Sequence, residues 1–266
     1  MTARADDRVE AVRVHNPDGA SPFLFVCDHA SNYLPPEFGT LGLAAADLAR
    51  HIAWDPGALP VSLHLADALD ATLVQSNISR LVIDCNRPLD ASNLFWTVSE
   101  GTVIPGNQNL TEGERRRRIE LAYHPFHNKI EQIVRRRLAL GQPTWIVSIH
   151  SFTPVYLGVS RPWEIGIIHD ADERISAPLI EALQVEDGLT VGVNEPYSPA
   201  DKVYFTLERH ARSRGLPCAM VEIRNDEIAD DAGQAAWGER LAGILSTMTG
   251  QFQKADLGFT QARQSA

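Results

Sequence analysis

Short, almost entirely apolar runs recur along this chain, separated by longer segments with the composition of helices. The runs expected to form strands are Phe23–Cys27, Thr72–Gln75, Leu81–Asp84, Trp145–Ile149, Ile165–Ile168 and Cys218–Ile223. Continuous apolar residues, rather than alternating ones, are typical of parallel strands that are covered on both faces. The alternation of such strands with helices predicts a doubly wound α/β fold, with a mostly parallel sheet between two layers of helices.

The segments between the strands are expected to be helical over Leu43–Ala53, Ala58–Leu69, Glu112–Leu140, Ile175–Gln184, Lys202–Arg214 and Gly233–Met248. Thr111 and Glu114 have the spacing of a capping box at the start of the longest helix. Pro125 is expected to break or kink that helix.

The chain of 266 residues shows no internal repeat and no linker, so residues 1–266 are interpreted as a single domain. Residues 1–20 are polar and are expected to form an irregular lead-in. Residues 251–266 are polar and rich in small side chains, and they are expected to fray.

The net charge of −10 disfavours nucleic acid and anionic membranes as partners, since both attract basic surfaces. It does not exclude a small anionic substrate, because the field inside a pocket can oppose the net charge. The N-terminus lacks the apolar core of a signal peptide, and no apolar run approaches the roughly 20 residues of a membrane span. A cytoplasmic protein is therefore expected. Cys27, Cys85 and Cys218 lie in or beside apolar runs and are interpreted as buried, reduced thiols.

Two histidines stand at the ends of predicted strands. His29 follows Phe23–Cys27 after one residue, and His150 follows Trp145–Ile149 directly. Ligands of open α/β sheets bind beyond the carboxyl ends of the strands. Two imidazoles and a carboxylate would suit a divalent metal there, most plausibly zinc. Asp55 is a candidate third ligand, although an Asp before Pro is also a common helix cap.

Glu222 lies within the apolar run Cys218–Ile223. An ionised carboxylate in such a strand is costly unless it is paired or functional. Beside a metal-activated water it would be a suitable general base. A structural ion pair with Arg224, on the same face of the strand, is the alternative, and both roles are compatible.

A polar segment, Asp84–Arg87, follows another predicted strand. The planar guanidinium of Arg87 matches a carboxylate, and the amide of Asn86 can donate a further hydrogen bond. The pair is interpreted as a clamp for an acidic substrate, with an exposed turn as the alternative.

His124 and His127 are three residues apart and would share one helix face. They are interpreted either as a rival metal site or transition-state donor, or as supporting or surface residues. Ser151 follows His150, but no Gly-x-Ser-x-Gly elbow surrounds it, which disfavours a serine hydrolase.

Together these motifs resemble the N-formylglutamate amidohydrolase family. The matching segments span almost the whole chain and are Cys27–Asn32, Ile83–Pro88, Tyr123–His127, Ser148–Ser151 and Val221–Asn225. That family is similar to zinc carboxypeptidases, aspartoacylases and cell-wall amidases, which share a phosphorylase/hydrolase-like α/β sheet.

The resemblance implies zinc held by His29, His150 and one carboxylate, with Glu222 as general acid and base. It also implies that Asn86 and Arg87 grip a substrate carboxylate. The chain departs from the family pattern where Asp-His-Ala-Ser replaces the usual Pro-His-Ser-Gly, which indicates a divergent member. Asn32 stands where relatives often have a glutamate ligand, and Asp55 is therefore the expected third ligand.

The expected function is that of a zinc-dependent amidohydrolase, which removes a formyl or other small acyl group from an N-acylated acidic amino acid such as N-formylglutamate. The residues expected to bind this substrate are Asn86, Arg87, Ser151, Arg161, Arg224 and His124. The alternatives are a peptidoglycan amidase or carboxypeptidase of similar fold, for which an export signal would be expected, and a metal-free binding module without catalysis.

Overall fold

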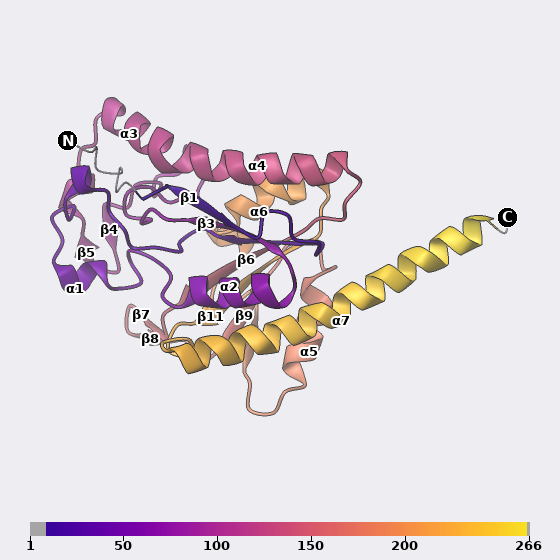
Figure 1. Ribbon diagram of the computed structural model, residues 1–266. Coiled ribbons are helices and arrows are strands. Elements are labelled where there is room, and N and C mark those ends of the chain that lie inside the picture. The colour runs from indigo at the N-terminus through magenta and orange to yellow at the C-terminus, as the bar shows by residue number, and fades with distance from the viewer. Residues whose placement is uncertain (1–8, 265–266) are drawn as a thin grey trace, which may run out of the picture.

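A mostly parallel sheet runs through the centre of the computed structural model, which describes residues 9–264 and their side chains through residue 249 (Figure 1). Its seven strands have the order β1-β3-β2-β6-β11-β9-β10. They are β1 Val12–His15, β2 Phe23–Cys27, β3 Thr72–Ser76, β6 Trp145–Phe152, β9 Ile165–Ile168, β10 Val191–Val193 and β11 Cys218–Arg224. Only β1 against β3 and β9 against β11 are antiparallel within this sheet.

Helices cover both faces of the sheet, which confirms the predicted fold class (Figure 1). The helices α2, α5 and α7 lie on one face, and α4 and α6 lie on the other. Alternate residues of β2 serve the two cores, because successive side chains of a strand point to opposite faces. Phe23 and Phe25 pack with the first group of helices, whereas Leu24 and Val26 pack with the second. All five residues of β2 are buried, as its apolar sequence predicts.

The helices are short except for two. Their bounds are α1 Ala45–Leu48, α2 Ala58–Ala68, α3 Glu112–Arg118, α4 His124–Ala139, α5 Ser176–Gln184, α6 Phe205–His210 and α7 Asp231–Gln264. Two small hairpins, β4 (Val98–Ser99) with β5 (Thr102–Val103) and β7 (Val155–Tyr156) with β8 (Val159–Ser160), lie outside the main sheet. None of the described helices is long and apolar enough to cross a membrane.

The predicted strand Leu81–Asp84 is wrong. The segment forms a buried turn whose backbone bonds to neighbouring loops: Asp84 N donates to Leu94 O at 2.9 Å. Its apolar side chains are buried under these loops rather than in the sheet, and periodicity alone does not separate the two cases.

Other boundaries also differ from the predictions. The expected helix Leu43–Ala53 contains only the single turn α1, and the expected lead-in contains the edge strand β1. The strand β10 was not expected. The helix α7 continues through residues 251–264, where the sequence predicts fraying. Both edge strands are short and only partly buried, so their apolar signal is weak.

The longest predicted helix divides around a wide turn. The capping box is confirmed, because Glu114 N donates to Thr111 Oγ1 at 3.2 Å and Thr111 N donates to Glu114 Oε2 at 2.7 Å. A π-helical turn over Ile119–Tyr123 then joins α3 to α4. This turn immediately precedes Pro125, whose missing N–H removes one helical hydrogen bond. The proline is thus accommodated without breaking the helix.

Candidate metal centre and active site

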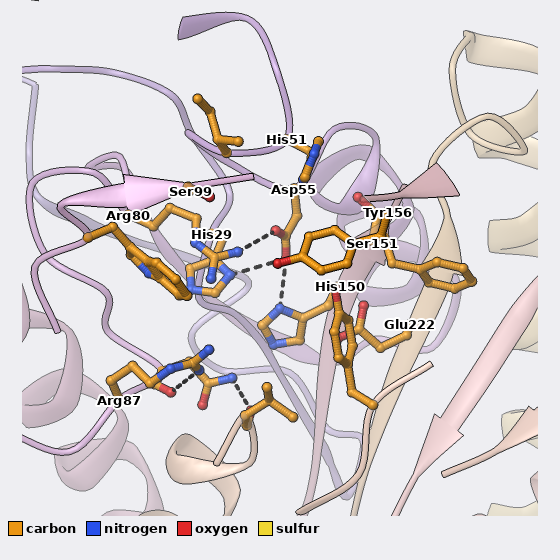
Figure 2. Close-up of a pocket in the computed structure, with 16 residues that line it drawn as sticks. His29, His51, Asp55, Arg80, Arg87, Ser99, His150, Ser151, Tyr156 and Glu222 are labelled. Atoms are coloured by element: carbon orange, nitrogen blue, oxygen red, sulfur yellow. Dashed lines mark hydrogen bonds and ion pairs between the residues drawn. The ribbon is translucent and has the colours of Figure 1, made fainter. Parts of the chain in front are cut away.

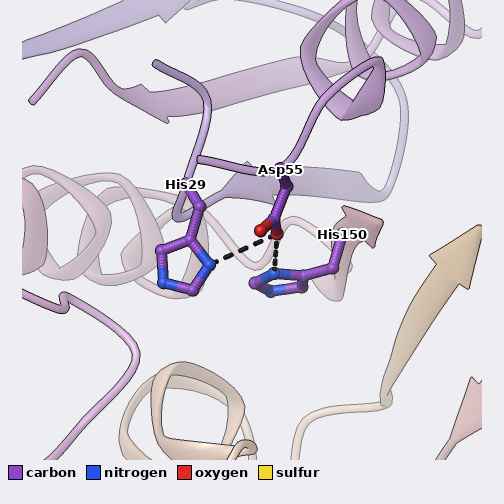
Figure 3. A group of neighbouring side chains, drawn as sticks. All are labelled: His29, Asp55 and His150. Carbon is purple, nitrogen blue, oxygen red and sulfur yellow. Dashed lines mark hydrogen bonds and ion pairs between the residues drawn. The ribbon is translucent and has the colours of Figure 1, made fainter. Parts of the chain in front are cut away.

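Three buried side chains from separate segments of the chain meet at the carboxyl ends of the central strands (Figure 3). Asp55 Oδ2 lies 3.2 Å from His29 Nδ1 and 2.7 Å from His150 Nδ1. Potential ligand atoms of the three residues all lie within 4.8 Å of one another. Within the described part of the chain, no other group of three His, Cys, Asp or Glu residues has this closeness. The arrangement can converge on a single ion.

The sheet order explains how these residues meet. His29 follows β2 and His150 lies in β6, and these strands are parallel neighbours with Phe23 paired to Trp145. Their carboxyl ends therefore emerge side by side, as in other open α/β sheets. Asp55 joins them because its backbone N–H donates to the carbonyl of His29 at 2.9 Å.

Asp55 is not the side-chain cap of α2. The N-cap position of that helix is Gly57, with a φ of 80° and no side-chain cap bond. A Cβ at Gly57 would lie 2.4 Å from the carbonyl oxygen of Ile228, so glycine is required by both conformation and space. The tight turn before α2 leaves the carboxylate of Asp55 free to face the histidines.

A second carboxylate lies at the other nitrogen of each histidine, hydrogen-bonded to His29 and at ion-pair distance from His150. His29 Nε2 donates to Asp84 Oδ1 at 2.7 Å, and His150 Nε2 faces Asp28 Oδ2 at 3.3 Å. Metal-binding histidines commonly contact a carboxylate in this way, which sets the tautomer and the ring orientation. The Nδ1 atoms of both histidines therefore face Asp55. Two imidazole nitrogens and a carboxylate oxygen fit a divalent metal.

The buried charged groups of the site shift one another's pKa values. Although burial disfavours the charged imidazolium, the carboxylates Asp28 and Asp55 raise the pKa of His150 well above its usual value. Burial also opposes ionisation of Asp55, but His29 and His150 lower the pKa of its carboxyl. A divalent cation would take the place of the imidazole protons, since metal ligands must be deprotonated.

Glu222 reaches the same place from β11, where it is paired with His150 across the parallel strands. Its side chain is buried, and its Oε2 atom has no hydrogen-bond partner among the described residues. Burial raises the pKa of Glu222 to about 7, against the opposing charge of His150. The predicted pairing with Arg224 is not seen: Arg224 instead forms ion pairs with Glu164, Asp226 and Glu227.

These residues line one cavity of about 120 Å³ (Figure 2). Asn86, Arg87 and Ser151, three of the expected substrate-binding residues, also line it. The wall residues that the sequence did not indicate are His51, Ile52, Arg80, Trp96, Ser99, Phe152, Tyr156, Tyr197 and Val203. The lining thus combines carboxylates and histidines with two arginines and with an aromatic wall, which consists of Trp96, Phe152, Tyr156 and Tyr197.

The segment Asp84–Arg87 brings two different polar groups to the cavity. Asn86 uses its side chain internally, because Nδ2 donates to Val203 O and Oδ1 accepts from Thr206 N at 3.0 Å. Arg87 Nη1 donates to the carbonyl of Asn86 at 2.8 Å, while its Nε has no partner among the described residues. Arg87 is therefore the residue of the predicted clamp with a donor still available.

The model of a known family matches most of the chain. The match covers residues 21–229 and is to N-formylglutamate amidohydrolase. The chain belongs to the N-formylglutamate amidohydrolase family. The predicted resemblance is thereby confirmed.

Individual proteins of known sequence or structure are similar to this chain. An N-formylglutamate deformylase of Pseudomonas aeruginosa is 24% identical over 245 residues, covering 85% of this chain and 91% of the relative. A protein of known structure from Agrobacterium tumefaciens is 43% identical, with a TM-score of 0.89 over 92% of this chain and 97% of that one. An N-formylglutamate amidohydrolase from Ralstonia eutropha is 19% identical, with a TM-score of 0.68 over 93% of this chain and 100% of that one. The last of these shows the shared fold.

Three of the predicted substrate residues do not line the cavity in this N-formylglutamate amidohydrolase family member. Arg161 lies 4.7 Å from the ring centres of both Tyr156 and Tyr197, so it packs on two residues of the lining without being part of it. Arg224 is held by its carboxylate partners, as described above. His124 is partly exposed beside Glu120 on the outer helix.

His127 belongs to the core and not to a metal cluster. Its Nε2 donates to the carbonyl of Cys85 at 2.9 Å, and its Nδ1 lies 2.9 Å from His210 Nε2. Burial, and then the neighbouring His210, lowers the pKa of His127 to about 3. Of the two predicted roles for the pair His124 and His127, the supporting one matches the position of His127.

Three further charged residues of the site, Asp28, Arg80 and Asp84, have no role assigned from the sequence. Asp28 and Asp84 stand beside residues that were singled out, and both are charged groups at the ends of apolar runs, whereas Glu222 lies within one. Arg80 lies near the same segment, and its guanidinium pairs with Asp84 at 2.9 Å and with Asp55 at 3.5 Å. The signal used for Glu222 would have found the two aspartates. The aromatic wall has no comparable local signal.

Proposed function

We propose that this protein is a zinc-dependent amidohydrolase that removes a formyl, or another small acyl, group from an N-acylated acidic amino acid such as N-formylglutamate. The observation that carries the proposal is the convergence of His29, Asp55 and His150 beside the unpartnered carboxylate of Glu222, in a cavity that Arg87 also lines. Membership of the family and the name of the Pseudomonas relative support the choice of substrate.

Zinc suits the donor set. Two imidazoles and one carboxylate are a common protein ligand set for catalytic zinc, which keeps a further position open. When bound, zinc supplies a Lewis acid that polarises the acyl carbonyl and makes water acidic enough to ionise at about pH 7. Asp84 and Asp28 hold the histidines in the orientation that this role needs.

Glu222 is proposed to move the proton. It accepts a proton from the attacking water, the water oxygen bonds to the acyl carbon, and Glu222 then gives the proton to the leaving nitrogen as the amide bond breaks. A general base works best when its pKa is near the working pH, and burial places the pKa of Glu222 at about 7. The products are formate and the free amino acid when the acyl group is formyl.

Two arginines of the cavity would serve different charges. Arg87 has an unused donor and is proposed to bind a substrate carboxylate. Arg80 is tied to Asp84 and Asp55 beside the proposed metal site. Its fixed positive charge is suited to the oxygen of the acyl carbonyl as negative charge develops there.

The test is metal content and a substrate panel. Protein purified without chelators should contain about one zinc per chain, and it should release formate from N-formylglutamate. The panel consists of formyl and acetyl derivatives of glutamate, aspartate and glutamine, so that the acyl group and the side-chain charge are varied separately. A stoichiometrically zinc-loaded protein that is inactive on every member would contradict the proposed substrate class.

A further inference from the structure

We propose that Thr206 is a positioning residue of the metal centre, which orients Asp28 and, through it, His150. Asn86 connects Thr206 to Asp84, so that one chain of hydrogen bonds and ion pairs joins the outer nitrogens of both histidines. The inference rests on the metal site of the proposed function. It also gives Asn86 a role in the protein interior rather than only at the substrate.

The first half of the chain starts at His29. Its Nε2 donates to Asp84 Oδ1 at 2.7 Å, and the same oxygen accepts from the backbone N–H of Asn86 at 3.0 Å. The other oxygen of Asp84 accepts from Arg80 at 2.9 Å and from Trp96 Nε1 at 3.0 Å. Asp84 is fully buried, and every one of these donors restricts its orientation.

Asn86 carries the connection to α6. Its Oδ1 accepts from the backbone N–H of Thr206 at 3.0 Å, and its Nδ2 donates to the carbonyl of Val203. Two polar groups at the start of α6 are thereby satisfied by a side chain from a distant loop. The start of α6 is held at a defined distance from the Asp84–Arg87 segment.

The second half runs through Thr206 to His150. Thr206 Oγ1 donates to Asp28 Oδ1, while Asp28 Oδ2 faces His150 Nε2 at 3.3 Å. Asp28 and Thr206 are both buried, so water does not replace the hydroxyl as a donor. The helix α6 has Tyr204 at its N-cap and no side-chain cap bond, so the hydroxyl of Thr206 is not a helix cap.

Thr206 is the side chain that donates to Asp28 Oδ1 in this structure. Without the hydroxyl, this buried oxygen would lose its donor, which is costly, and the carboxylate would be free to rotate away from His150. The imidazole of His150 would then lose the partner that sets its tautomer and ring orientation. Substitutions of such supporting groups typically weaken metal binding by about 10–100-fold.

The experiment measures metal affinity and so needs no substrate. Zn²⁺ affinity is determined by chelator competition for the unsubstituted protein and for the variants Thr206→Val and Thr206→Ser. Thr206→Val, which is nearly isosteric, should bind Zn²⁺ about 10–100-fold more weakly. Thr206→Ser keeps the hydroxyl and should bind within a few-fold of the original protein. The visible spectrum of the Co²⁺-loaded protein should change with Thr206→Val and not with Thr206→Ser.

A matched control separates positioning from general loss of stability. Thr72 is also a fully buried threonine, but its hydroxyl accepts from Arg137 at 2.9 Å, at the opposite end of β3 from the site. Thr72→Val should lower stability without changing Zn²⁺ affinity. If Thr206→Val does not fold, Asp28→Ala tests the same link, because it removes both the oxygen that accepts from Thr206 and the oxygen that faces His150.

Two results are distinguishable. Wild-type Zn²⁺ affinity in a folded Thr206→Val protein, or in a folded Asp28→Ala protein, would overturn the positioning role alone. An original protein that binds no Zn²⁺ would overturn both the proposed metal centre and this inference.

Discussion

Glu222 of β11 stands directly opposite His150 of β6 in the parallel register of the two strands. The pairing places a carboxylate whose Oε2 has no hydrogen-bond partner among the described residues beside the candidate metal ligands, although the two residues are 72 positions apart in the chain. A shift of the register by one residue would turn Glu222 to the opposite face of the sheet. Strand pairing is therefore what brings the proposed base to the proposed metal.

The substitution Glu222→Gln should preserve the fold and the bound metal, because the amide is nearly isosteric with the carboxyl. It should lower kcat by about 10²–10⁴-fold, the usual contribution of general acid–base catalysis. Steady-state kinetics and metal analysis on the same preparation check this. A folded, zinc-loaded Glu222→Gln protein with near-normal kcat would rule out the proposed mechanism.

The pH profile should depend on the same residue. A general base must be ionised, so kcat/KM should fall as the pH drops through the pKa of Glu222. Burial raises that pKa to about 7 in the absence of a metal, and a cation at the triad would lower it by favouring the carboxylate. The acidic limb should therefore lie below about pH 7 and disappear in Glu222→Gln. An unchanged acidic limb in that variant would assign the titration to another group.

Single replacements of His29, Asp55 or His150 by alanine should abolish stoichiometric zinc and activity together. Each removes one of three ligands, and a catalytic site has no protein ligand to spare. The matched control is His124→Ala, which removes a partly exposed histidine outside the cavity and should leave zinc content unchanged. Elemental analysis of the purified variants decides the assignment, and a variant that retains full zinc identifies a residue that is not a ligand.

Arg87 should determine preference for an acidic substrate. Arg87→Ala should reduce kcat/KM on N-formylglutamate. The loss of transition-state stabilisation should be about 1.5–3 kcal/mol, the value of a hydrogen bond to a charged group. The uncharged analogue N-formylglutamine should be much less affected. Arg224→Ala serves as a control, since its guanidinium is engaged by other carboxylates. Equal losses on both substrates would indicate that Arg87 supports the structure instead.

Stability should fall in mild acid because of the buried pair His127 and His210. Burial, and then the charge of Arg209, lowers the pKa of His210 to about 4, and that of His127 is about 3. An unfolded histidine titrates at about 6.5, so the unfolded state binds more protons below that pH. The stabilising effect of keeping both rings neutral is complete above pH 6.5 and is lost as the pH falls toward 4.

Each such histidine contributes a slope of up to about 1.4 kcal/mol per pH unit to the free energy of unfolding. Denaturant unfolding between pH 7.5 and about 4.5 measures the slope. Replacing His210 with Gln removes one titrating group and should flatten the curve. Glu131, whose Oε2 lies 3.6 Å from His210 Nδ1, opposes the effect because its negative charge favours the protonated ring. A curve as steep in His210→Gln as in the original protein would assign the pH dependence elsewhere.

Much of the architecture follows from local patterns. The strands β2, β3, β6, β9 and β11 coincide closely with apolar runs, because strands in the middle of a covered sheet bury both faces. The errors concern segments whose surroundings are not local. Leu81–Asp84 is apolar because loops cover it, and β1 and β10 are edge strands with weak patterns.

The site divides in the same way. The sequence by itself singled out His29 and His150 after apolar runs, Glu222 within one and Arg87 after another, because charged or strongly polar residues are unusual in or directly after such runs. It also located Asp55 but left a helix cap open as its role. Only the tertiary structure decided that point, because the turn at Gly57 aims the carboxylate at two histidines supplied by other segments.

Long-range partners are what sequence reasoning could not supply. The apparent pair of Glu222 and Arg224 is separated by the fold, which gives Arg224 other carboxylates and leaves Glu222 beside His150. The supporting contact from Thr206 to Asp28 joins residues 178 positions apart. Local patterns record which side chains are buried or polar, because each element has its own periodicity. Which of them meet depends on strand order and register, and these are properties of the whole sheet.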